Sequence, residues 1–224
     1  EKVLSTRYHD YENANRLLKL HNINAWVNCS RREYSDYKSL KNELSNQTII
    51  SFFVVGGDWG LGCNAVHFLD LFSFLIDDDE VETMSFANTD SVVQYSKRPG
   101  FIEITGSING KFKSGPSFSL LSKKDTAAVR MIYINTEIST YIIDELSGKI
   151  FVLIHGDGAW TRQKFNAPKT SEIMQSVAES ILLYGNCNLP THPQSVRIHI
   201  PFMEGLMDFL EVDMTDQNAE CLIT

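Results

Sequence analysis

Residues 48–71 read TIISFFVVGGDWGLGCNAVHFLDL, and this stretch decides the fold. Its first part, 48–55, is dense in β-branched and aromatic residues and predicts a buried strand. The strand runs into a loop that carries Gly57, Gly60 and Gly62. From Cys63 to about Ile76 apolar residues recur at helical spacing, and we expect one stripe of this helix to face the sheet: Asn64, Phe68, Leu71 and Leu75.

The chain changes character after this helix. Between residues 81 and 165 short β-rich runs recur, with turn signals and no helices between them. Such a series predicts an antiparallel meander, because parallel βαβ winding would alternate strands with helices. The expected strands span 81–87, 91–96, 100–106, 117–122, 127–135, 138–145, 149–155 and 159–165.

Helices are expected before and after this region of the chain. Helical spacing predicts them in the first twenty residues and over 33–44, 170–185 and 192–211, the last kinked at Pro201. Alternation over 23–29 predicts one more strand. The predicted fold class is therefore α+β, with one large, mostly antiparallel and open-faced β-sheet and helices packed on one side.

The composition excludes several classes of protein. The chain has 224 residues, 43% of them hydrophobic and 21% charged, as in soluble globular proteins. A net charge of -8 argues against a nucleic-acid surface. No apolar run approaches the roughly 20 residues that cross a bilayer, and no signal peptide is present, so we expect a cytoplasmic protein without a membrane partner. The cysteines lack metal-ligand spacing, which predicts free thiols and no metal site: Cys29, Cys63, Cys187 and Cys221.

The glycine-rich loop, 57–62, allows two interpretations. It leads from a strand into a helix N-terminus, which favours anions, so it could bind a phosphate. The simpler interpretation is a plain tight turn. Its glycines do not follow the Gly-x-Gly-x-x-Gly order of a dinucleotide cradle.

A second stripe of the helix carries polar groups: Cys63, His67 and Asp70, followed by Phe74. The N-terminal turns of a helix disfavour a cationic imidazole, which would keep His67 neutral and able to act as a base. The simpler interpretation is a structural histidine paired with Asp70. His155 and His199 lie among apolar residues and are interpreted as structural.

Three segments in the same order resemble the glucose-fructose oxidoreductase / inositol dehydrogenase / rhizopine-catabolism (Gfo/Idh/MocA) family. Residues 1–5 resemble its Glu-Lys-Pro junction, 27–32 its first strand of the second domain with an Arg-containing exit, and 57–71 its glycine-rich loop and His-x-x-Asp helix. The resemblance implies that 1–22 is a junction helix closing a Rossmann domain that this chain lacks. It also implies that 23–224 is a substrate-binding and oligomerisation domain.

The resemblance further implies an NAD(P)-dependent oxidoreductase acting on a hydroxyl of a sugar, nucleotide-sugar or cyclic polyol. Lys2 would orient the hydroxyl and contact the cofactor, and His67 would be the general base. Arg32 would lie near substrate or cofactor. NAD or NADP would bind mainly to the missing domain, so this chain alone would be inactive. Further substrate contacts would come from Asn64, Trp59 and Asp70.

Two positions depart from the family pattern. Val3 replaces the junction proline, and Cys63 replaces the aspartate that many members carry four residues before the histidine. They favour an alternative, a non-catalytic binding or scaffold module of the same fold. In either case the sheet would be too large for its helices to cover, so we expect a homodimer or homotetramer through its open face. The apolar residues expected on that face are Ile102, Ile104, Val129, Met131, Tyr133, Ile142, Phe151 and Leu153.

Overall fold

The computed structural model describes residues 3–96, 98–213, 216 and 219–223. Its helices are α1 (Tyr8–Leu20), the 3-10 helix η1 (Ser30–Glu33), α2 (Ser35–Leu44), α3 (Leu61–Ile76), α4 (Thr170–Tyr184) and α5 (His192–Phe209). Its strands are β1 (Ile49–Gly57), β2 (Val81–Thr89), β3 (Gln94–Tyr95), β4 (Ile102–Glu103), β5 (Gly106–Phe112), β6 (Ser117–Lys123), β7 (Met131–Thr136), β8 (Ser139–Asp144), β9 (Lys149–Ile154) and β10 (Trp160–Lys164).

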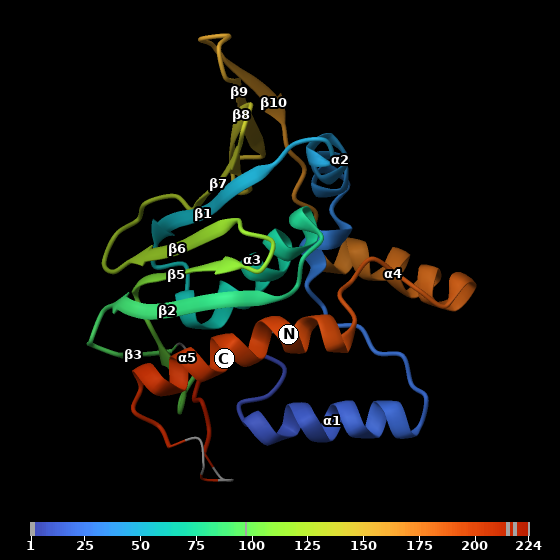
Figure 1. Ribbon diagram of the computed structural model, residues 1–224, viewed down its shortest axis with the longest axis vertical. Helices are drawn as coiled ribbons and strands as arrows, with labels where there is room; N and C mark the ends of the chain where they lie inside the picture. Colours follow the sequence, from blue (N-terminus) through green and yellow to red (C-terminus); the bar gives the residue numbers. More distant parts are fainter. Residues whose placement is uncertain (1–2, 97, 214–215, 217–218, 224) are drawn as a thin grey trace.

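Eight strands form one sheet, in the order β10-β9-β8-β7-β1-β6-β5-β2 (Figure 1). Strand β1 pairs in parallel with β6 and antiparallel with β7, and the outer pairs are antiparallel. Strands β3 and β4 form a separate small hairpin. The predicted class, α+β with a large and mostly antiparallel sheet, is confirmed.

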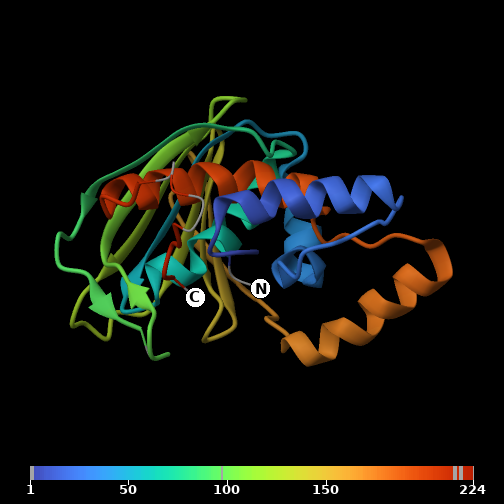
Figure 2. The ribbon, with the colours of Figure 1, turned by 90° about the horizontal axis from the view of Figure 1, so that it is seen from below.

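Helices cover one face of this sheet. Helix α5 runs beside β2, and α1 lies along the outer side of α5 (Figures 1 and 2). Helix α4 projects from the rest of the chain (Figure 2). Within the described part of the chain, no helix has the length and apolarity needed to cross a membrane.

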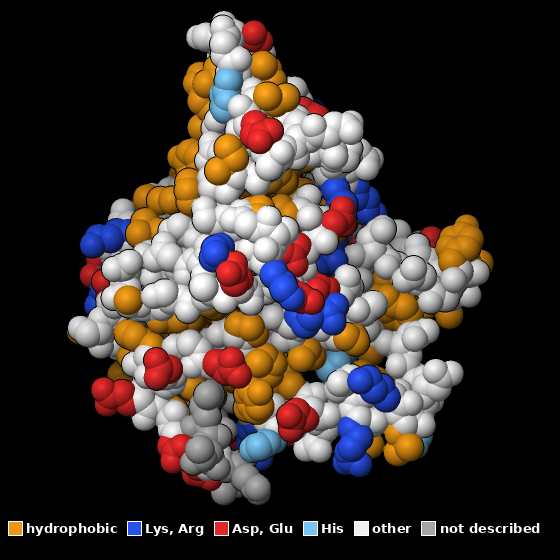
Figure 3. All heavy atoms as spheres, viewed as in Figure 1, with side chains coloured by type: hydrophobic (Ala, Val, Ile, Leu, Met, Phe, Trp, Pro, Cys, Tyr) orange, Lys and Arg blue, Asp and Glu red, His pale blue; other side chains and the backbone are white. Residues whose placement is uncertain are grey.

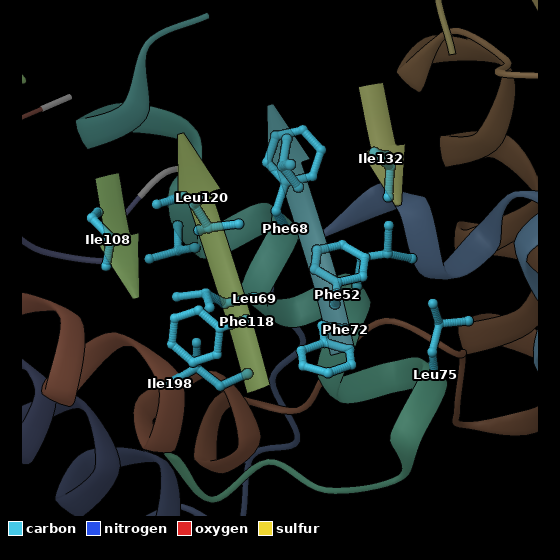
Figure 4. Close-up of a cluster of buried hydrophobic side chains, with 14 of the residues drawn as sticks. Phe52, Phe68, Leu69, Phe72, Leu75, Ile108, Phe118, Leu120, Ile132 and Ile198 are labelled. Carbon is cyan, nitrogen blue, oxygen red and sulfur yellow. The ribbon is translucent and has the colours of Figure 1, made fainter. Parts of the chain in front are cut away.

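The core forms where α3 meets the sheet. The rings of Phe52 on β1 and Phe72 on α3 stack with centroids 4.8 Å apart, and both residues are fully buried (Figure 4). The predicted stripe is buried at Phe68, Leu71 and Leu75. Leu69 and Phe72 are buried as well, and Phe72 packs against the sheet through the rings of Phe52 on β1 and Phe112 on β5. Helix α5 contacts α3 in addition. Truncating such an aromatic side chain to alanine costs about 3–5 kcal/mol.

Two sequence predictions about strands are wrong. Residues 23–29 form no strand. They make one isolated β-bridge, between Trp26 and Thr191, and no strand among the described residues runs beside the rest of their backbone. In place of the expected strand over 100–106 the chain forms β4, and β5 begins at Gly106. Asn109-Gly110, a pair typical of turns, lies inside β5. Gly110 is needed there because a Cβ would collide with the Thr83 carbonyl and the Phe118 ring.

The uncovered face of the sheet is apolar around β1, β7, β8 and β9. Along β7, Ile132 and Ile134 are buried while Met131 and Tyr133, on the other face, are only half-buried. Hydrophobic side chains also gather along the projecting strands β8 to β10 (Figure 3). Ile104 was expected on this face but is fully buried in the core, because it follows the hairpin β3–β4 instead of joining the large sheet.

Candidate functional site

A cavity of about 530 Å³ lies at the carboxyl end of β1, between the N-terminus of α3 and the β3–β4 hairpin. It brings together two of the predicted substrate-binding residues, Trp59 and Asn64, with Cys63. Side chains from the hairpin complete it. Its lining is mainly polar or carries polar groups: Asp58, Trp59, Cys63, Asn64, Gln94, Tyr95, Ser96, Arg98, Glu103, Thr105 and Ser122, with Gly60 and Ile104.

The glycine-rich loop is closed by a carboxylate from the hairpin. The backbone N–H groups of Gly62 and Cys63 donate to the two oxygens of Glu103, the second over 3.3 Å. A negative charge here is favoured by the helix dipole, and it uses the amides that a phosphate would need. The structure therefore supports the tight-turn interpretation of this loop over the phosphate site.

Glycine is required at one position of the loop, Gly60, and a second glycine, Gly62, leaves room for the hairpin carboxylate. Gly60 has a φ of 74°, in the left-handed region, and a Cβ on it would lie 2.8 Å from Cys63 Sγ and 2.9 Å from Asn64 Nδ2. A Cβ on Gly62 would lie 2.7 Å from a Glu103 carboxylate oxygen. The loop thus brings the hairpin carboxylate and the first turn of α3 close together.

Hydrogen bonds hold the cavity wall in place. Asn64 Nδ2 donates to the carbonyl oxygens of Trp59 and Gly60 over 2.8 and 3.0 Å. The Trp59 indole donates to the Leu121 carbonyl over 2.7 Å, and its ring meets Phe68 edge-on. Among the described residues, none donates to the amide oxygen of Asn64, which leaves it as an acceptor at the cavity wall.

His67 lies one turn of α3 beyond the cavity-lining Cys63 and is half-buried. The buried His199 of α5 is close enough to feel its charge: burial, and then His67, lowers the pKa of His199 to about 3. Neighbouring imidazoles disfavour the charged form of each other. The two histidines were separate features in the sequence, and only the crossing of α3 and α5 joins them.

Asp70 has Arg32 as its ion-pair partner. Arg32 Nε lies 2.9 Å from Asp70 Oδ2 and the terminal nitrogen 2.8 Å from Oδ1, with both side chains buried. Burial raises the pKa of Asp70 to about 6, and the charge and hydrogen bond of Arg32 oppose the shift. It ties η1 to α3. A contact of either residue with substrate stays a prediction.

A second ion cluster supports the same helix. The Glu145 carboxylate accepts two hydrogen bonds from Arg31, at 2.7 and 2.8 Å, one from Tyr37 and one from Arg130. The Arg31 guanidinium lies 4.3 Å from the centroid of the Phe68 ring. These charges, above all Arg31, hold the pKa of Glu145 at about 2 despite its burial. Arg31 is thus a structural partner in this chain.

The remaining sequence predictions concern Lys2, His155, the cysteines and a metal site. Lys2 lies outside the described residues, so its predicted role stays a prediction. His155 is exposed, at the end of β9, and not in the apolar surroundings expected, although it bonds Thr140 Oγ1 and the Glu137 carbonyl. None of the four cysteines forms a disulfide, as predicted. No cluster of potential metal ligands occurs within the described ranges.

Solved structures with this fold exist. UDP-N-acetylglucosamine 3-dehydrogenase GnnA from Acidithiobacillus ferrooxidans aligns over 93% of this chain and 70% of its own, with a TM-score of 0.71 and 9% identity. The dehydrogenase MviM from Clostridium difficile aligns over 92% of this chain and 69% of its own, with a TM-score of 0.65 and 16% identity. A third match is a protein from Desulfitobacterium hafniense, assigned as an NADPH-dependent oxidoreductase without an established activity. It aligns over 88% of this chain and 66% of its own, with a TM-score of 0.67 and 12% identity.

The chain has the fold of Gfo/Idh/MocA-type oxidoreductases. The resemblance noted in the sequence is thereby confirmed for the fold, in which this chain spans about two thirds of the length of the structures it matches. No protein-family model matches the chain, and no curated protein matches its sequence. The activity and substrate of the whole protein therefore have to be proposed from the site.

The described residues do not form a cradle for a dinucleotide. The strand–loop–helix unit that could hold a pyrophosphate, β1 to α3, has its leading amides bound to Glu103. A second negative charge at this point would be repelled by that carboxylate. The cavity beside the N-terminus of α3 is therefore the candidate site that these residues form.

Proposed function

We propose that this chain is the substrate-binding part of an NAD(P)-dependent oxidoreductase acting on a hydroxyl of a sugar, nucleotide-sugar or cyclic polyol. The observation that carries the proposal is the position of His67, one helical turn from the wall of a polar cavity, in a fold shared with a UDP-sugar 3-dehydrogenase. Cavities of this volume, about 530 Å³, suit small organic substrates.

In the proposed reaction His67 takes the proton of the substrate hydroxyl. It must be neutral to do so, because only the neutral imidazole can accept a proton. Lys2, by resemblance, would polarise the same hydroxyl. A bound nicotinamide, held outside this chain, would supply the hydride acceptor.

The cavity chemistry supports a polyhydroxylated substrate. Carboxylate, amide and hydroxyl groups line it, and together they can accept hydrogen bonds from sugar hydroxyls and donate to them: Glu103, Asn64, Gln94, Thr105 and Ser122. Trp59 has its polar end already bonded, so the small exposed part of its ring at the cavity offers apolar contact. Asn64 and Trp59 are therefore proposed as substrate-binding residues.

We also propose that the open sheet face joins two or four copies of the chain. Exposed and half-buried apolar residues pair across β1 and β7, Phe53 with Tyr133 and Val55 with Met131. A contiguous apolar surface of this kind is characteristic of an interface. Light scattering of the full-length protein should give the mass of a dimer or tetramer, and a stable monomer at micromolar concentration would contradict the proposal.

The alternative is a binding module of the same fold without catalysis. The observation that favours it is Cys63, whose thiol lies where many members of the fold carry an acid and is 3.1 Å from Asn64 Nδ2. The retained His67 opposes it. Reduction of NAD or NADP by the full-length protein, assayed with a panel of sugars, nucleotide-sugars and cyclic polyols, separates the two. Turnover of at least one substrate class is expected, and binding without turnover across the panel would favour the module.

A further inference from the structure

The cavity at the N-terminus of α3 has a buried floor and an exposed mouth. The most buried residues of its lining, none more than 8% exposed, form the floor: Trp59, Ile104, Thr105 and Ser122. Asp58, Tyr95 and Arg98 line the same cavity but are exposed, which places them at its mouth. A bound sugar therefore meets one set of groups around its enclosed part and another around a substituent that points outward.

Arg98 gives the mouth a positive charge. It is the one cationic side chain among the described residues that line the cavity. A guanidinium is planar and carries five N–H donors, and two of them match the two oxygens of a carboxylate or phosphate. The remaining donors let it keep another contact while it binds such an anion. The mouth thus offers a binding group for an anionic substituent.

Backbone hydrogen bonds hold the turn that carries Arg98. Its N–H donates to Ser96 Oγ over 3.4 Å, and its carbonyl accepts from the Phe101 N–H over 3.3 Å. The Ser96 N–H donates to the Phe101 carbonyl over 2.9 Å. These contacts fix the backbone of Arg98 relative to β4.

Strand β4 is in turn fixed to the first turn of α3. The Glu103 carboxylate accepts the backbone N–H groups of Gly62 and Cys63, and the Ile102 N–H donates to the Leu222 carbonyl over 2.7 Å. One hairpin therefore provides a carboxylate beside α3 and a guanidinium at the mouth. A second negative charge is disfavoured beside α3 and favoured near Arg98.

We propose that the cavity selects a sugar with an anionic substituent, a carboxylate or a phosphate, and that Arg98 binds this substituent. The inference rests on the proposed function and narrows its substrate class. Neutral hydroxyls of the sugar face Asn64 and Glu103, and the anion faces Arg98. Asp58, the carboxylate at the mouth, opposes the anion and weakens its binding.

Steady-state kinetics of the full-length protein test the selection with matched substrates. The set is a neutral hexose with the uronic acid, the sugar phosphate and the nucleotide-sugar of the same hexose. At least one anionic member should have a KM about tenfold below that of the neutral hexose, as expected for one charge-assisted contact. Turnover of the neutral hexose with the lowest KM of the set would overturn the proposal.

Two charge changes at the mouth should act in opposite directions. Arg98→Gln should raise the KM of the anionic substrate about tenfold with little change in kcat, and Asp58→Asn should lower it by about two- to fivefold. Neither should alter the KM of the neutral hexose. Arg162→Gln, which changes an exposed arginine on β10, is the matched control and should alter none of these values. If Arg98→Gln raises the KM of neutral and anionic substrates equally, Arg98 does not bind the anion.

Tyr95→Ala distinguishes the sources of the anion. Tyr95 is 94% exposed at the mouth, where its ring can stack on a nucleobase. A higher KM for the nucleotide-sugar alone identifies a nucleotide, and an unchanged KM for a preferred uronic acid or sugar phosphate identifies a simple anion. Calorimetry separates this proposal from the proposed function. Binding of an anionic sugar that depends on Arg98, without turnover, would refute the oxidoreductase reaction and support the anion site, whereas turnover confined to neutral sugars would do the reverse.

Discussion

The Arg32 guanidinium and the Asp70 carboxylate face each other through two contacts, 2.9 and 2.8 Å long, inside the core. They connect η1 to the middle of α3, whose first turns carry His67. By their resemblance to the family pattern, both residues are expected near the substrate. The geometry gives them a second role, because the helix that presents the candidate base cannot shift without separating this pair.

Asp70→Asn should destabilise the protein by about 3–5 kcal/mol, because it leaves the buried Arg32 charge without a counter-charge. Chemical denaturation of the full-length protein measures the change. The double replacement Arg32→Met with Asp70→Leu should recover most of the loss, since a buried pair can be exchanged for apolar residues. If Asp70→Asn changes the midpoint no more than a surface substitution does, the pair does not support the helix as described.

Glu103→Gln should lower the free energy of unfolding by about 0.5–2 kcal/mol, because it removes the negative charge at the N-terminus of α3. The matched control is Glu82→Gln on β2, whose ion pair with Lys111 is solvent-exposed and should contribute little. Thermal unfolding of the two variants checks the difference. Equal effects would show that Glu103 contributes no more than an exposed carboxylate.

His199→Gln should make stability less dependent on pH between 7 and 5. The pKa of His199 is about 3 in the folded protein against 6.5 for a free histidine, so the unfolded chain binds a proton that the folded chain does not. Stability therefore falls as pH falls below about 6.5, by about 2 kcal/mol at pH 5 for this group.

The difference between the two proteins isolates that contribution. The pKa of Asp70, about 6, lies in the same range, and the carboxylate acts in the opposite direction, but it is present in both proteins and cancels. Urea denaturation at pH 7 and pH 5 measures each free energy of unfolding. Parallel losses in the wild-type protein and His199→Gln would mean that His199 is protonated in the folded state.

Local pattern in the sequence was sufficient for the centre of the fold. The apolar run of β1, the glycine loop and the helical spacing of α3 are features of consecutive residues, and each was predicted near its observed position. The burial of α3 on more than one side was not predicted, because it also depends on α5, which lies far along the chain. An apolar stripe on a helix predicts that one side of it is buried, whereas a helix packed between a sheet and other helices is buried on several sides.

The misses share a physical cause, which is that pairing partners lie far apart in sequence. Residues 23–29 have strand alternation, yet a strand forms only where a neighbouring strand offers hydrogen bonds. Gly110 signals a turn, but the ring of Phe118 and the Thr83 carbonyl demand a glycine within β5. No pattern in the sequence indicated a role for Glu103, because that role depends on the contact between the β3–β4 hairpin and the N-terminus of α3.

The central claim is that His67 is the general base, and its replacement in the full-length protein tests this most directly. His67→Ala should lower turnover of the best substrate by roughly 10²–10⁴-fold, the contribution expected of a positioned base. His155→Ala, which changes an exposed histidine at the end of β9, should leave turnover unaltered. A His67→Ala protein that turns over at the wild-type rate would contradict the account.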